Sequence, residues 1–179
     1  MSEKAEPYGF EIIYFKESSR TWYEIKDLSS SESVFEVSIV GSRKPEFYLQ
    51  DSEGRELLVL KRISSISNVY RFFKNNIRYA TFSYSTSCCN TNYEVQTEKK
   101  NYLGSGFIGS TFQFVEKNGR VSFEVYKGFK GFRSNNIIEV YDNIEPEVAI
   151  LVGILLDQLA KKQQKNKMPD DSTHIPYRI

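Results

Sequence analysis

Short stretches of alternating apolar and polar residues fill most of this chain, and one long apolar run stands near its end. The run extends from Val148 to Leu156 without a polar residue, and Leu159 and Ala160 follow it. Acidic residues precede the run and lysines follow it, which is the arrangement that the dipole of an α-helix favours. We therefore expect a helix at about 145–165.

A helix that is apolar on every face must be covered on every side. This apolar run is too short to cross a bilayer, which takes about 20 residues. Almost everything that precedes it resembles β-strand, so the predicted cover is a β-sheet that closes around the helix.

Strand-like segments recur along the chain, separated by turn-forming residues at intervals of about 8 to 12 residues. Asp51–Gly54, Lys74–Asn76 and Lys117–Gly119 are typical of tight hairpin turns. Gly104–Gly106 is interpreted as a loop. The predicted strands are 8–15, 21–26, 34–40, 47–49, 57–60, 69–73, 77–84, 93–97, 107–115, 121–126 and 137–141.

The pattern predicts a mainly β protein, a closed antiparallel β-barrel of about 12 strands wrapped around a hydrophobic C-terminal α-helix. A single domain is expected over 8–165, because a chain of 179 residues is the usual size of one domain. Residues 1–7 are expected to be disordered, and 166–179 to form a C-terminal tail that is disordered or laid over the surface.

Composition agrees with this fold and narrows the function. Aromatic residues make up 15% of the chain, which favours β structure. The formal net charge is only +1, so the field of the whole molecule would attract neither nucleic acid nor acidic membrane. Recognition of a charged partner must then be local, and nucleic acid is a disfavoured partner.

The two cysteines, Cys88 and Cys89, are adjacent, which rarely allows a disulfide between them. This usage is typical of a reducing compartment. The first seven residues have no apolar core, so no secretory signal is predicted. We expect a cytoplasmic protein or one at the cytoplasmic face of a membrane, where Cys88 and Cys89 are candidates for acylation.

Two segments resemble the tubby-like superfamily, which includes the tubby C-terminal domain, the phospholipid scramblases and the LURP-one-related proteins. One is the hairpin Phe47–Leu58, in which an aromatic and aliphatic strand turns on an acidic, Gly-containing loop; the other is Asn143–Asp157, a polar lead-in to an aliphatic helix with Asp in its last turn. The resemblance implies a barrel closed around a helix and an association with phospholipid membranes. The Pro-rich segment and cysteine cluster of animal scramblases are missing, so neither their calcium site nor any set of functional residues is carried over.

Motifs for catalysis or cofactor binding are missing from the sequence. His174 is the only histidine and lies in the predicted tail, where a general base would be poorly positioned. Cys88 and Cys89 lack the further ligands that zinc needs, and no P-loop or dinucleotide fingerprint is present. We expect a protein that is not an enzyme and has no cofactor or bound metal.

Two groups of cations are candidates for binding an anionic headgroup. The first is Arg62, Arg71, Lys74 and Arg78, with the alternative that these residues only cover a solvated outer face of the barrel. The second lies in 127–133, where Lys127, Lys130 and Arg133 alternate with Phe129 and Phe132. A mobile loop that inserts the two aromatic rings into a membrane and a twisted edge protected by charge explain this spacing equally well.

The leading hypothesis is peripheral binding to anionic phospholipids or phosphoinositides. One alternative is a scaffold module that binds a protein partner, and another is scramblase-like phospholipid transport, for which the short helix would need oligomers or partners. A lipocalin-like carrier is the remaining alternative. It requires a hollow barrel, so it depends on whether Ile150, Leu151, Ile154 and Leu155 fill the interior.

Overall fold

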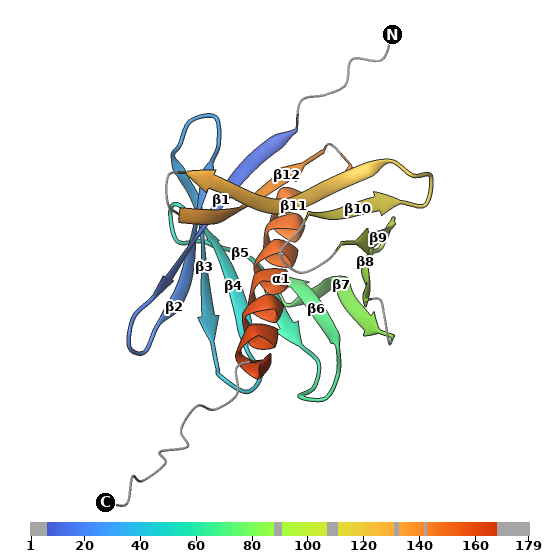
Figure 1. The fold of residues 1–179 in the computed structure, drawn as a ribbon, viewed down its shortest axis with the longest axis horizontal. Coiled ribbons are helices and arrows are strands. Elements are labelled where there is room, and N and C mark those ends of the chain that lie inside the picture. The colour runs from blue at the N-terminus through green and yellow to red at the C-terminus, as the bar shows by residue number, and fades with distance from the viewer. Residues whose placement is uncertain (1–6, 88–90, 107–110, 131–132, 142, 168–179) are drawn as a thin grey trace, which may run out of the picture.

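A twelve-stranded antiparallel barrel closed around one helix is the fold of the computed structural model (Figure 1). The structure describes residues 7–87, 91–106, 111–130, 133–141 and 143–167, except for the side chains of 129–130, 133–134 and 164–167. The elements are β1 (Tyr8–Lys16), β2 (Thr21–Asp27), β3 (Ser33–Val40), β4 (Glu46–Asp51), β5 (Glu56–Arg62), β6 (Val69–Lys74), β7 (Ile77–Thr86), β8 (Thr91–Thr97), β9 (Asn101–Ser105), β10 (Phe112–Glu116), β11 (Val121–Lys130), β12 (Arg133–Val140) and α1 (Pro146–Lys167).

Each strand pairs with its neighbours in sequence, and β1 pairs with β12 to close the barrel. The turns are built from the expected residues. Asn75 and Asn76 both have positive φ, at 52° and 62°, as a two-residue hairpin turn requires. Asp51 accepts hydrogen bonds on Oδ1 from the backbone N–H groups of Glu53 and Arg55, both at 2.9 Å, which fixes the β4–β5 turn.

The helix α1 runs through the middle of the barrel, with strands on all sides of it (Figure 1). Ile150, Leu151 and Ile154 are fully buried and Leu155 is 1% exposed, so the predicted filling of the interior is confirmed. At Gly153 the helix approaches β12 so closely that an added Cβ would lie 2.4 Å from Ile138 Cδ1. These side chains occupy the space that a ligand in the lumen would need.

Two of the differences between the predicted and the observed strands are explained by glycine. Residues 101–105 form β9, a strand that the sequence analysis did not predict, because Gly104 and Gly106 are typical of a loop. In the structure Gly104 makes room for Phe114, whose Cε1 would lie 2.5 Å from an added Cβ. Likewise, residues 127–130 continue β11, and Gly128 accommodates Ile137.

The barrel has two ends with different loops. At the entry end, where α1 begins, lie the turns 28–32, 52–55, 75–76, 98–100 and 117–120. At the exit end, where the last turns of α1 emerge, lie the loops 17–20, 41–45 and 63–68 and the tip of the β11–β12 hairpin. Ion pairs anchor the helix at both ends: Lys74 with Glu145 at the entry end and Lys127 with Asp157 at the exit end.

Candidate functional site

The four cations of the first predicted group are spread over the barrel. Arg62 lies at the exit end, where its Nε donates to the carbonyl of Ser67 at 2.7 Å. Lys74 lies at the entry end, 3.4 Å from Glu145. Arg71 and Arg78 lie near each other on the outer face, because Arg71 is opposite Thr81 in the sheet and Arg78 donates to Thr81 Oγ1 at 3.0 Å. These four side chains therefore do not form one pocket.

The second predicted group lies on the β11–β12 hairpin at the exit end. Lys127 is half exposed to solvent and its Nζ is 3.9 Å from Asp157. Lys130, the last residue of β11, pairs with Arg133, the first residue of β12. The side chains of Lys130, Arg133 and Phe129 lie outside the described part of the structure, as does residue Phe132.

The remaining features are the acylation candidates, the histidine, and possible metal sites and membrane spans. Cys88, Cys89 and His174 lie outside the described residues. Within the residues that are described, no group of three or more His, Cys, Asp or Glu side chains is arranged to hold a metal ion. No helix among them has both the length and the apolarity to span a membrane.

Apolar side chains project into solvent at the exit end. Ile66 is 93% exposed at the tip of the β5–β6 loop, where a turn from Ser64 to Ser67 holds it out. The Ser67 N–H donates to the Ser64 carbonyl at 3.3 Å, which closes that turn. Ile63 in the same loop and Val40 at the end of β3 are also exposed. A side chain that projects this far from a structured loop would lose its contact with water if it entered an apolar phase.

An aromatic and cationic stack borders the same end. Phe15 stacks on Trp22 with 5.2 Å between ring centroids, and Phe15 is 36% exposed. The Arg20 guanidinium lies over the Trp22 ring at 4.9 Å and pairs with Glu36. Aromatic rings beside a cation are typical of side chains that lie at a membrane interface.

Charge is distributed unequally between the ends. Among the described side chains, cations outnumber carboxylates at the exit end, whereas the two are nearly equal in number at the entry end. The exit-end cations are Lys16, Arg20, Arg43, Lys44, Lys61, Arg62, Lys127, Lys161 and Lys162, against the carboxylates Glu17, Glu36, Glu46 and Asp157. The small net charge of the chain therefore conceals a basic end, which attracts anionic surfaces within about 10 Å at 0.1 M salt.

Asp157 ties the helix to the barrel at this basic end. Its side chain is only 7% exposed and contacts Lys161 Nζ at 2.6 Å. Tyr23 and Asn136 donate hydrogen bonds to its two oxygens at 2.7 and 2.9 Å. Burial opposes ionisation, but the Lys161 ammonium and these two donors outweigh it, so the pKa of Asp157 is lowered. The Lys161 ammonium also lies 3.2 Å from the centroid of the Tyr14 ring.

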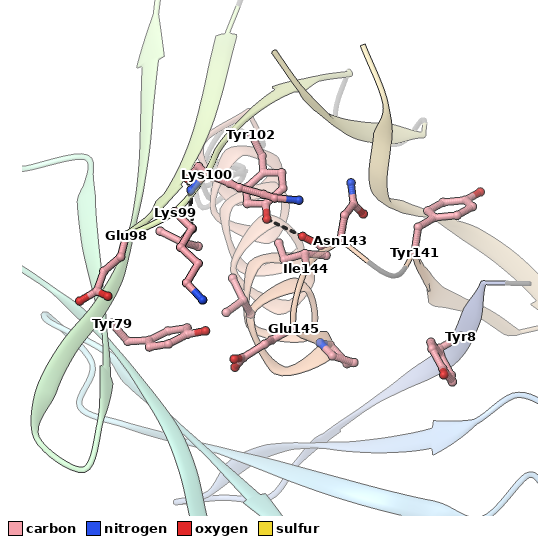
Figure 2. Close-up of a pocket in the computed structure, with 13 residues that line it drawn as sticks. Tyr8, Tyr79, Glu98, Lys99, Lys100, Tyr102, Tyr141, Asn143, Ile144 and Glu145 are labelled. Carbon is pink, nitrogen blue, oxygen red and sulfur yellow. Dashed lines mark hydrogen bonds between the residues drawn. The ribbon is translucent and has the colours of Figure 1, made fainter. Parts of the chain in front are cut away.

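A pocket of about 710 Å³ opens at the opposite, entry end of the barrel (Figure 2). Its floor is apolar, built from Ile144 and Val148 of the helix start and from the ring of Tyr102. Tyr79 stands at one side of the pocket and Tyr8 and Tyr141 at the other. A cavity of this size lies in the range of small-molecule sites, about 300–1,000 Å³.

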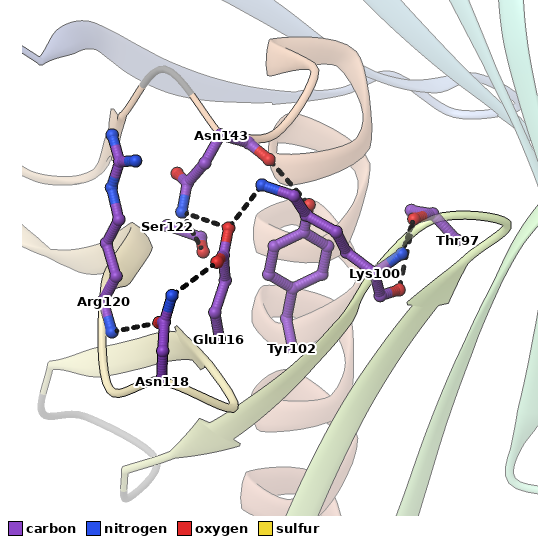
Figure 3. Close-up of polar contacts among 8 residues, drawn as sticks. All are labelled: Thr97, Lys100, Tyr102, Glu116, Asn118, Arg120, Ser122 and Asn143. Atoms are coloured by element: carbon purple, nitrogen blue, oxygen red, sulfur yellow. Dashed lines mark hydrogen bonds and ion pairs between the residues drawn. The ribbon is translucent and has the colours of Figure 1, made fainter.

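A polar network forms the wall behind the pocket (Figure 3). Glu116 accepts hydrogen bonds from Lys100 at 2.6 Å and from Asn143 at 2.8 Å. Tyr102 donates to the carbonyl of Asn143 at 2.7 Å, so the connection to the helix is held from two sides. The bond from Lys100 is the main cause that lowers the pKa of Glu116, and burial raises the pKa of Tyr102 to about 12. Near neutral pH this wall thus contains a carboxylate and a neutral phenol.

Comparison with known proteins supports the fold. No family model matches the chain, and a search of curated proteins gives no match. Among solved structures, the chain is similar to an X-ray structure of a protein from Arabidopsis thaliana, with 13% sequence identity and a TM-score of 0.63. The match covers 87% of this chain and 93% of that one. At this identity the likeness shows a shared barrel fold and carries no function with it.

Several residues of these two ends were not found from the sequence. Ile66 sits among serines, where hydrophobic periodicity gives no signal. Lys99 and Lys100 lie in the turn between β8 and β9, and no sequence pattern marks them as part of a site. The four tyrosines of the pocket come from β1, β7, β9 and the segment after β12, so only the closed barrel brings them together.

Proposed function

We propose that the chain is a non-enzymatic, tubby-like domain that binds anionic phospholipids or phosphoinositides peripherally at a cytoplasmic membrane face, with its exit end toward the lipid. The observation that carries the proposal is the exposed Ile66 at a loop tip, on the end of the barrel where cations are in excess. A membrane-docking surface needs both features, because apolar insertion provides affinity for the bilayer and cations attract anionic headgroups.

The resemblance to the tubby-like superfamily supports the same reading. The hairpin Phe47–Leu58 is formed by β4 and β5, and the segment Asn143–Asp157 leads into and forms the buried helix. Both parts of the resemblance thus fall on elements that define the barrel. The solved structure from Arabidopsis thaliana is consistent with membership of a superfamily of such barrels.

The binding free energies expected from these side chains favour a reversible association with the membrane. Each Lys or Arg near an anionic surface contributes about 1 kcal/mol, and burial of an isoleucine side chain contributes about 1.5–3 kcal/mol. Several cations with one or two inserted side chains give an affinity that responds to lipid charge. The basic end is therefore expected to bind anionic vesicles and to release them at high salt.

Vesicle co-sedimentation tests the proposal with a matched pair of variants. Ile66→Ser removes the exposed tip at the exit end, and Ile77→Ser removes an isoleucine that is 72% exposed at the entry end. We expect Ile66→Ser to weaken binding to phosphatidylserine-containing vesicles about 10-fold, and Ile77→Ser to leave it unchanged. Pure phosphatidylcholine vesicles should bind weakly.

A second pair tests the charge. Lys44→Glu reverses an exposed cation at the exit end, and Lys117→Glu reverses one at the entry end. Only Lys44→Glu should weaken binding. Binding that does not depend on anionic lipid, or equal losses in both members of either pair, would reject the proposal in favour of a scaffold role for the barrel.

A further inference from the structure

The entry-end pocket combines an apolar floor with a cation that has no ion pair or hydrogen bond to the residues that the structure describes. Ile144 and Val148 of the floor are buried at 9% and 0% exposure, and Tyr102 is buried at 2%. Tyrosine rings stand on opposite sides of this floor (Figure 2). The arrangement offers a flat molecule aromatic contact at its edges, above side chains that close the bottom of the pocket.

The charged groups around the pocket differ in what they already bind. Lys100 is held by Glu116 at 2.6 Å, and Glu145 is held by Lys74 at 3.4 Å. In contrast, the side chain of Lys99 has no ion pair or hydrogen bond with any part of the chain that the structure describes. Figure 2 shows its ammonium group pointing toward Tyr79 and the pocket, whereas the Glu98 carboxylate points away.

The Tyr79 phenol lies on the same side and is hydrogen-bonded to the Glu145 carboxylate. Burial and the neighbouring Glu145 raise the pKa of Tyr79, so its hydroxyl stays protonated at neutral pH. It lies beside the Lys99 ammonium in Figure 2. The Lys99 ammonium is therefore the group on this side that is available to a carboxylate or similar anionic group attached to a flat apolar body.

We propose that the entry-end pocket binds a small organic anion with a flat, apolar body, in which Lys99 pairs with the anionic group and the rings of Tyr8, Tyr79 and Tyr141 flank the body above the buried floor. This site is distinct from the membrane-docking end and lies at the opposite end of the barrel. It would therefore remain open to the aqueous phase while the protein is bound to lipid.

Binding of 2-naphthoate, measured by calorimetry and by amide chemical shifts without any membrane, tests this site. The neutral analogue 2-naphthylmethanol has the same ring system and serves to isolate the charge. Lys99→Met retains most of the apolar stem of the lysine, and Lys117→Met changes a lysine of the β10–β11 turn that does not line the pocket.

We expect 2-naphthoate to bind the wild-type protein saturably and to shift the amide signals of 97–102 and 143–148. It should bind Lys99→Met about 5- to 10-fold more weakly, in keeping with the loss of a charge-assisted hydrogen bond. Lys117→Met should bind both probes as the wild type does, and the alcohol should bind the wild type and Lys99→Met equally. Absence of saturable binding, equal loss of both probes in Lys99→Met, or shifts confined to the exit end would overturn the proposal. None of these results depends on whether the protein binds vesicles.

Discussion

Replacing Gly153 by alanine adds one methyl group where the central helix packs closely on β12. A Cβ at this position would lie 2.4 Å from Ile138 Cδ1 and 3.1 Å from Ile138 Cγ1. Ile138 is fully buried, so its side chain has little room to move. Gly to Ala in an exposed helix stabilises by about 0.5–1 kcal/mol, but overpacking a core costs about 1–3 kcal/mol. We expect a net loss of about 1 kcal/mol.

A second substitution tests whether the alanine methyl at position 153 contacts the Ile138 side chain. Ile138→Val removes the Cδ1 methyl and alone should cost about 0.5–1.5 kcal/mol. In the double variant the alanine methyl occupies part of the space that this methyl leaves, so the combined loss should be about 1 kcal/mol smaller than the sum. Ile12→Val is the matched control, because Ile12 Cδ1 lies 3.6 Å from the same Cβ, an ordinary contact, and should couple little.

Urea unfolding followed by circular dichroism measures all six proteins, namely wild type, the three single variants and the two double variants with Gly153→Ala, with the free energy of unfolding taken from the transition midpoint and slope. Stabilisation by Gly153→Ala would mean that this face of the helix is not enclosed by strands. Strict additivity of Gly153→Ala with Ile138→Val would contradict the packing of α1 against β12.

Two electrostatic predictions concern the anchors at the ends of the helix. Asp157→Ala should cost about 3 kcal/mol, because it leaves the Lys161 ammonium and two hydrogen-bond donors without their acceptor. Since the native pKa of Asp157 is lowered, the stability that this carboxylate provides is complete above its unfolded value of about 3.9 and is lost as the pH falls through the native value. The Tm difference between wild type and Asp157→Asn should accordingly shrink below about pH 4. At the entry end, Glu116→Gln should lower stability by about 1 kcal/mol by weakening the bond from Lys100, and Glu98→Gln should stay within about 0.5 kcal/mol of wild type.

The barrel and its helix could be predicted because both depend on local patterns. An apolar run from Val148 to Leu156 can only be enclosed, and the alternating segments before it supply the enclosure. The strand β9 was missed because Gly104 serves close packing against Phe114 instead of a turn. The same reasoning explains why residues 127–130 are strand: Gly128 admits the side chain of Ile137.

The functional surfaces were harder to predict because they depend on which loops share an end of the barrel. Arg62 and Lys74 belong to the same pair of strands, β5 and β6, yet they lie at opposite ends because the strands are antiparallel. Conversely, Arg20 and Lys127 are far apart in sequence and lie at the same end. Pairing in the sheet decides these neighbours, and no single segment carries that information.

Attachment of an environment-sensitive fluorophore at position 66 or 77 tests the proposed orientation most directly. The native cysteines are first replaced by Cys88→Ser and Cys89→Ser, and Ile66→Cys or Ile77→Cys then provides one labelling site at each end. On addition of phosphatidylserine-containing vesicles, the label at 66 should brighten and shift to shorter wavelength as it enters an apolar phase, while the label at 77 stays unchanged. An unchanged signal at 66, or a response at 77 that equals or exceeds it, would contradict docking through the exit end.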